Sequence, residues 1–145
     1  MDEERIDFFN TSVLIDSFCY IHILFRHYSS SIKQHQLDKT YHYDENIDYK
    51  KIPLFLKDVV IKFKDNCAQD DFDRNKIYLS FGDKTYAIWF RPIQISKPGN
   101  LKESILRLQT FYPITNTTEN ATIGEFRKVN IDSSLIYFVR KPNIL

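Results

Sequence analysis

The sequence predicts an α+β fold, with N-terminal helices packed on a four-stranded antiparallel β-meander in a single two-layer domain over residues 1–145. Apolar residues recur every three or four positions in the first half of the chain. From Lys76 onward they alternate with polar residues, which is the period of a strand. The length of 145 residues and the 43% hydrophobic content fit one folded domain with its own core.

The helical part is expected over residues 4–66 and has two pieces. Residues 4–28 carry apolar side chains at helical spacing, namely Leu14, Phe18, Ile21, Leu24, Phe25 and Tyr28. A polar stretch follows, and residues 49–66 (YKKIPLFLKDVVIKFKDN) then predict a second helix. Pro53 suits the first turn of that helix, and its apolar residues fall on one side.

The β-meander is expected over residues 76–140. The segments KIYLSF and KTYAIWFRPI flank the dipeptide Gly82–Asp83, an arrangement typical of a β-hairpin. Residues 103–115 (ESILRLQTFYPIT) predict a third strand and residues 133–141 (SSLIYFVRK) a fourth. We expect the segment between them to be a polar connection.

Composition excludes several classes of protein. The three glycines are scattered singly, whereas P-loops and dinucleotide folds need clustered glycines. Lys and Arg number 20 against 19 Asp and Glu, so the net charge is +1, and a duplex-DNA binder usually carries a larger basic excess. Any affinity for nucleic acid must therefore be concentrated in one part of the surface.

We expect no metal and no cofactor, because the histidines and the two cysteines do not follow a zinc-binding spacing. Cys19 and Cys67 are expected to be reduced thiols, with one disulfide between them as the alternative. The N-terminus is acidic and polar, and no apolar run is long enough to cross a membrane. These features predict a cytoplasmic protein without a membrane partner.

The segment YIHILFRHYS at residues 20–29 is the first candidate for chemistry. His22 and Arg26 are four residues apart and would share one face of a helix. His27 joins them only if the segment bends or ends near Arg26. The second candidate is the strand LRLQTFYPIT, on which we expect Leu106 and Leu108 to point into the core. Thr110 and Tyr112 would share that face and lie at the mouth of the helix–sheet interface.

Together these groups suit metal-independent cleavage of RNA. Histidine titrates near neutral pH and can act as general base toward the 2′-hydroxyl or as general acid toward the leaving oxygen. Arginine binds phosphate bidentately, and hydroxyl donors stabilise the charge that develops on it. Exposed aromatic residues such as Tyr41, Tyr43 and Trp89 could stack on bases.

The segments HILFRHYSS and QTFYP, with the order of the predicted elements, resemble the barnase–EndoU–colicin–RelE-like nuclease assemblage, in particular phage and polymorphic-toxin members with a HI…RH element and a T-x-Y-P strand end. The resemblance covers residues 5–139. It implies a toxin-like, metal-independent endoribonuclease acting on tRNA or another structured RNA. It also implies His22 and His27 as acid and base, Arg26 as phosphate ligand, and Thr110 and Tyr112 as hydroxyl partners.

Each candidate also has a purely structural explanation. Histidine on an apolar helix is commonly a core or boundary residue, and threonine and tyrosine both favour strands. The alternative function is a non-enzymatic interaction protein, such as an antitoxin, an immunity protein or a phage-encoded binder. A nuclease predicts that the five residues converge on one cleft. It also predicts RNA as the partner, with a cognate antitoxin or immunity protein as a second one.

Overall fold

The computed structural model describes residues 4–16, 52–72 and 75–140, which form a seven-stranded mixed sheet and two α-helices. In chain order the elements are β1 (Glu4–Phe8), β2 (Thr11–Ile15), α2 (Ile52–Asn66), a short 3₁₀ helix (Gln69–Asp71), β3 (Lys76–Phe81), β4 (Lys84–Lys97), β5 (Leu101–Pro113), α3 (Thr117–Gly124), β6 (Arg127–Asn130) and β7 (Leu135–Val139). The class is α+β. No helix in these ranges is long and apolar enough to span a membrane.

The strand order in the sheet is β1-β2-β5-β4-β3-β7-β6. Neighbouring strands are antiparallel except β2 and β5, which run parallel with Val13 opposite Leu106. The prediction of N-terminal helices on a four-stranded antiparallel meander is therefore wrong. The meander β3-β4-β5 exists, but β7 joins it beside β3, and a strand pair from the N-terminus joins it beside β5.

The N-terminal segment is a β-hairpin where a helix was predicted. Ile6 and Phe8 alternate with exposed residues along β1, and both are buried. The backbone reverses at Phe9, which has a φ of 55°, a value that a bulky side chain rarely adopts. The rest of the predicted first helix, residues 17–28, lies outside the described residues.

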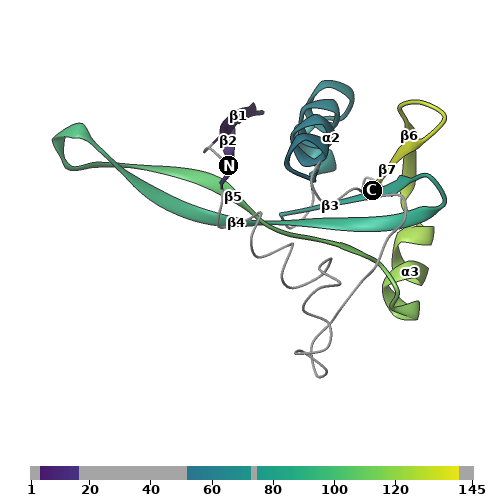
Figure 1. Ribbon diagram of the computed structural model, residues 1–145. Helices are drawn as coiled ribbons and strands as arrows, with labels where there is room; N and C mark the ends of the chain where they lie inside the picture. Colours follow the sequence, from purple (N-terminus) through teal and green to yellow (C-terminus); the bar gives the residue numbers. More distant parts are fainter. Residues whose placement is uncertain (1–3, 17–51, 73–74, 141–145) are drawn as a thin grey trace, which may run out of the picture.

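The second predicted helix is confirmed as α2, and it lies in the trough formed by the curved sheet, as Figure 1 shows. Its buried side chains recur at helical spacing and are Ile52, Leu56, Val59, Val60 and Phe63. The Phe63 ring packs edge-on against Tyr137 of β7 at a centroid distance of 5.2 Å. The Tyr137 hydroxyl donates a hydrogen bond to the Val59 carbonyl, which ties the helix to the sheet.

The opposite face of the sheet carries α3 near the end of β5 (Figure 1). Asn116 caps this helix by accepting hydrogen bonds from the backbone N–H groups of Thr118 and Glu119, at 2.8 and 3.1 Å. Ile123 packs with Ala87 and Ile114 in a second, smaller core. The predicted polar connection is therefore a helix followed by the short strand β6. Few apolar residues mark either element, because each buries little surface.

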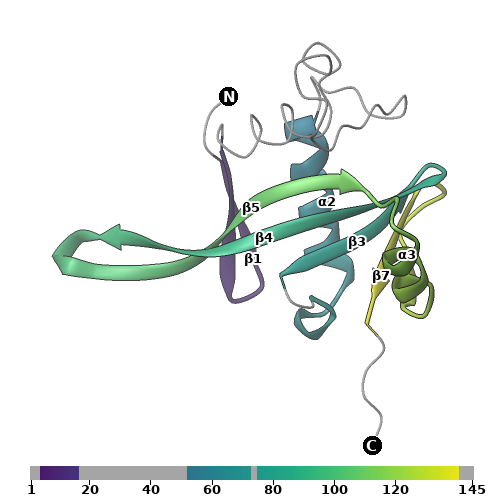
Figure 2. The same ribbon diagram turned by 90° about the horizontal axis from the view of Figure 1, so that it is seen from below.

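Strands β4 and β5 continue well beyond the sheet as a two-stranded arm, residues 91–107 (Figure 2). The β2 strand pairs with β5 only at Leu106 and Arg107. Beyond this point, among the described residues, the two strands pair only with each other. The arm turns at Pro98–Asn100, where Gly99 and Asn100 have positive φ values of 80° and 60°.

Candidate functional site

The structure places two of the five predicted site residues. Thr110 and Tyr112 both lie on β5. His22, Arg26 and His27 lie outside the described residues, as do Tyr41 and Tyr43.

A β-bulge decides where Thr110 and Tyr112 point. Phe90 pairs with Leu108 and Trp89 pairs with Thr110, so Gln109 has no partner on β4. The extra residue reverses the alternation along β5. Leu108 and Phe111 are both fully buried on the α2 side of the sheet, while Thr110 and Tyr112 lie on the other side.

The prediction that Leu108, Thr110 and Tyr112 share one face is therefore wrong. Leu106 and Leu108 do pack in the main core, as predicted. The two hydroxyl residues instead belong to the face of β3-β4-β5 that points away from α2. We call this surface the outer face, formed by Lys76, Tyr78, Ala87, Trp89, Arg91, Arg107, Thr110 and Tyr112.

A cation, an aromatic ring and a hydroxyl lie in one row across the outer face. Trp89 on β4 is paired with Lys76 on one side and with Thr110 on the other. The Lys76 ammonium lies 4.2 Å from the centroid of the Trp89 ring, which is within the range of a cation–π interaction. Trp89 is 40% exposed. An exposed ring beside a cation is suited to stacking on a base next to a phosphate.

The Thr110 hydroxyl is hidden from solvent and has no hydrogen-bond partner among the described residues. Leaving a hydroxyl without a partner costs about 1–3 kcal/mol, so the great majority of buried polar groups are paired. An unpaired hydroxyl beside Trp89 is therefore an unusual feature. Such groups concentrate at sites where stability is subordinate to function.

Tyr112 follows two residues later and contacts α3. Its hydroxyl donates a hydrogen bond to Glu119 Oε1 at 3.1 Å, and its ring lies 6.4 Å from that of Trp89. Burial, and next the Glu119 carboxylate, raise the pKa of the Tyr112 phenol well above its usual value. Tyr112 therefore stays protonated near neutral pH and can act as a hydrogen-bond donor.

Two arginines face each other where the outer face meets the arm. Arg91 on β4 is paired with Arg107 on β5. Arg107 Nη2 lies 2.6 Å from Asp16 Oδ2, just beyond the end of β2. Arg91 is exposed and has no ion-pair partner among the described residues, so its guanidinium is available to an anion.

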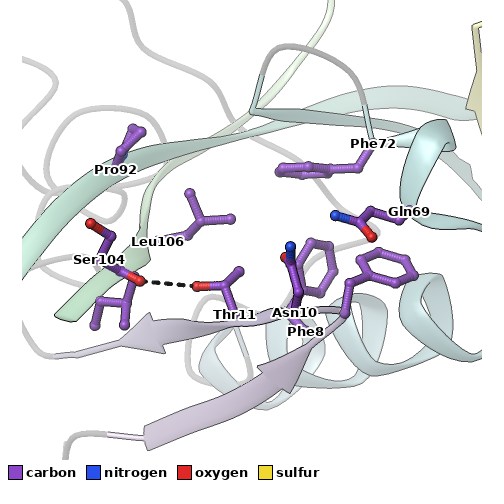
Figure 3. Close-up of a pocket in the computed structure, with 10 residues that line it drawn as sticks. Phe8, Asn10, Thr11, Gln69, Phe72, Pro92, Ser104 and Leu106 are labelled. Carbon is purple, nitrogen blue, oxygen red and sulfur yellow. Dashed lines mark hydrogen bonds between the residues drawn. The ribbon is translucent and has the colours of Figure 1, made fainter.

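A cleft of about 210 Å³ lies at the base of the arm, on the α2 side of the sheet (Figure 3). Its walls come from the β1–β2 turn, the 3₁₀ helix and the two arm strands; the lining residues are Phe8, Phe9, Asn10, Thr11, Gln69, Phe72, Pro92, Ser104, Ile105 and Leu106. Thr11 closes one wall by donating a hydrogen bond to the Ser104 carbonyl at 3.2 Å. The cleft opens on the face opposite Thr110 and Tyr112, so it is not part of the predicted site.

The sequence analysis missed Lys76, Arg91 and Glu119. Their roles depend on strand pairing and on α3, and no local motif indicates either. Cys67 is a poor nucleophile, because burial raises the pKa of its thiol from 9.0 to about 11. In residues 4–16, 52–72 and 75–140 no three His, Cys, Asp or Glu side chains are grouped so that they could hold a metal ion.

Comparisons of the chain with protein-family models, with curated proteins and with solved structures find no match. The function must therefore be argued from the residues of this chain.

Proposed function

We propose that the protein is a metal-independent endoribonuclease, toxin-like in character, that cleaves tRNA or another structured RNA. The observation that carries the proposal is the row of Lys76, Trp89 and Thr110 on the outer face. Its cation, aromatic ring and unpaired hydroxyl are the groups expected to hold a phosphate and an adjacent base.

The roles follow from the chemistry of the step. The 2′-oxygen attacks the phosphorus and passes its proton to a base, and the bond to the 5′-oxygen breaks as an acid protonates that oxygen. We assign acid and base to His22 and His27 and phosphate binding to Arg26. Thr110 and Tyr112 are assigned to donate hydrogen bonds to the phosphate oxygens. This requires that the Thr110 hydroxyl becomes accessible and that the Tyr112 hydroxyl exchanges Glu119 for the phosphate. The products are a 2′,3′-cyclic phosphate and a 5′-hydroxyl.

The covalent chain is compatible with this assignment. Asp16 contacts Arg107, which precedes Thr110 by three residues on β5. His22 follows Asp16 by six residues, and six extended residues span about 20 Å at most. The chain length between Asp16 and His22 is therefore compatible with the role assigned to His22 at the outer face.

The test is cleavage of purified tRNA and ribosomal RNA in the presence of EDTA. Discrete fragments with cyclic-phosphate ends are expected, and a 2′-deoxy substitution at the cleaved position should block cleavage. Replacing His22 or His27 by alanine should reduce the rate by about 10²–10⁴-fold, as for loss of a general acid or base. His35→Ala is the matched control, because His35 lies in the polar stretch between the two predicted helices.

Intact RNA in the presence of folded wild-type protein would refute the nuclease and favour the interaction-protein alternative. Cleavage that His22→Ala and His27→Ala leave unchanged would refute the assignment of the site.

A further inference from the structure

Within the ranges that the structure describes, no third strand pairs with the arm formed by residues 91–107 beyond Leu106. None of residues 91–104 is buried, and Leu101 at the tip is 64% exposed. A two-stranded hairpin alone is marginally stable in water. The outer arm thus adds little to the core, and an extension of this kind is better explained by a binding partner than by folding.

The charge of the arm indicates what that partner is. Residues 91–107 contain four basic side chains (Arg91, Lys97, Lys102 and Arg107) against one acidic side chain, Glu103, a net charge of +3. The whole chain has a net charge of only +1. The basic excess is therefore concentrated on the arm, which matches a polyanion such as a nucleic-acid backbone.

Contacts within the arm leave this positive charge available. Lys97 Nζ lies 2.6 Å from Glu103 Oε2, and Arg5 Nη1 lies 3.3 Å from Glu103 Oε1, so two cations share the single carboxylate. Arg91 and Lys102 are both exposed and have no ion-pair partner among the described residues. They are the two cations on the arm that are free to bind phosphate.

The arm continues the outer face. Arg91 follows Trp89 by two residues on β4, so both side chains point to the outer face; Arg91 is paired there with Arg107. Arg91 and Lys97 are separated along β4 by about 20 Å at the rise of a strand. A chain of nucleotides lying on the arm would thus run onto the row of Lys76, Trp89 and Thr110.

We propose that the arm binds the sugar–phosphate backbone of RNA and guides it onto the outer face. Arg91 is the principal phosphate ligand on that face, and Lys102, which pairs with Ser96 and so lies on the opposite face of the arm, is a second ligand. This inference rests on the proposed ribonuclease function. It identifies how that site holds RNA beyond the two nucleotides that flank the cleaved bond. The contacts are to phosphates, so the arm contributes affinity without sequence preference.

The test measures binding of a fluorescent 2′-O-methyl RNA oligonucleotide over a range of salt concentrations. This RNA lacks the nucleophile and cannot be cleaved, so binding is measured whether or not the protein is a nuclease. Loss of two phosphate contacts in Arg91→Ala/Lys102→Ala should reduce the slope of log affinity against log salt by about 1.4 for a single strand. Lys64→Ala, which removes a cation from α2, should leave the slope unchanged.

The outcomes separate this inference from the proposed function. A reduced slope in the arm variant alone supports the arm, even if wild-type protein leaves natural RNA intact. Equal slopes in the arm variant and the Lys64 control, or no binding by the wild type, overturn it. A change in oligomeric state with an unchanged slope would also overturn it, since the arm would then join two copies of the chain. Both arm side chains are exposed, so urea unfolding should confirm that the variant folds normally.

Discussion

Replacing Thr110 by valine should stabilise the protein. Valine keeps the shape and the strand preference of threonine but replaces the hydroxyl with a methyl group. The Thr110 hydroxyl is hidden from solvent and unpaired among the described residues. A buried hydroxyl without a partner costs about 1–3 kcal/mol, so its removal should raise the free energy of unfolding by about 1 kcal/mol or more.

Urea denaturation measures this effect. With a slope of about 1–3 kcal/mol per molar urea, a gain of about 1 kcal/mol moves the midpoint upward by about 0.3–1 M. Thr11→Val is the matched control, because the Thr11 hydroxyl donates a hydrogen bond to the Ser104 carbonyl at 3.2 Å. That variant should lose about 0.5–1.5 kcal/mol.

The Thr110→Val variant also distinguishes a structural role of the hydroxyl from a role in cleavage. If Thr110 donates to a phosphate in the proposed site, the valine variant should cleave RNA more slowly although it is more stable. A loss of stability equal to that of Thr11→Val would refute the argument, because the hydroxyl would then have a stabilising partner. Unchanged cleavage in the stabilised variant would remove Thr110 from the site.

Two further predictions concern the core and the response to pH. Phe111→Ala should lower the free energy of unfolding by about 3–5 kcal/mol, because the fully buried ring packs against Phe55 and Tyr86. Tyr112→Phe, which removes the hydroxyl that donates to Glu119, should cost about 0.5–1.5 kcal/mol in the same urea assay. A loss as large as that of Phe111→Ala would contradict the placement of the two side chains on opposite faces by the bulge. Burial raises the pKa of Cys67 from 9.0 to about 11, so the unfolded thiol releases its proton at lower pH than the folded one. This thiol therefore contributes stability that is fully present below pH 9 and is lost as pH rises through about 11. Between pH 8 and pH 10 the wild type should lose more stability than Cys67→Ala, and parallel losses would show that the thiol is not linked to folding.

The elements that the sequence predicted correctly are those with a strong local pattern. Helix α2 has a proline in its first turn and a complete apolar side, and the β3–β4 hairpin has Gly82 at a turn position where φ is 65°. Each of these patterns is formed by residues that are close together in the sequence. The prediction therefore required no knowledge of what the element packs against.

The N-terminal hairpin was missed because only the second of its two turn residues, Asn10, is typical of a turn. The positive φ falls on Phe9, where glycine or asparagine would have indicated a reversal. In addition, β2 is held by a parallel pairing with β5, more than ninety residues away in the chain. Such a pairing leaves no local pattern, and short apolar runs fit a helix and a strand equally well.

The face on which Thr110 and Tyr112 lie was predicted wrongly, because it too depends on a feature without a local pattern. Thr110 and Tyr112 do share a face, as strand periodicity requires, but periodicity assigned them to the face of Leu108. One unpaired residue, Gln109, reverses that assignment, and nothing in LRLQTFYP marks where a bulge occurs.

The bulge also explains how β5 combines two incompatible requirements. Without the extra residue, Phe111 would share a face with Arg107, and Thr110 would share one with Leu108. The buried ring would then be exposed, and the hydroxyls would lie in the main core. With Gln109 in place, Leu108 and Phe111 both stay in the core, while Arg107, Thr110 and Tyr112 all lie on the outer face. A single inserted residue thus brings Arg107 of the arm and the proposed hydroxyl donors onto one surface, as the proposed binding of a long RNA requires.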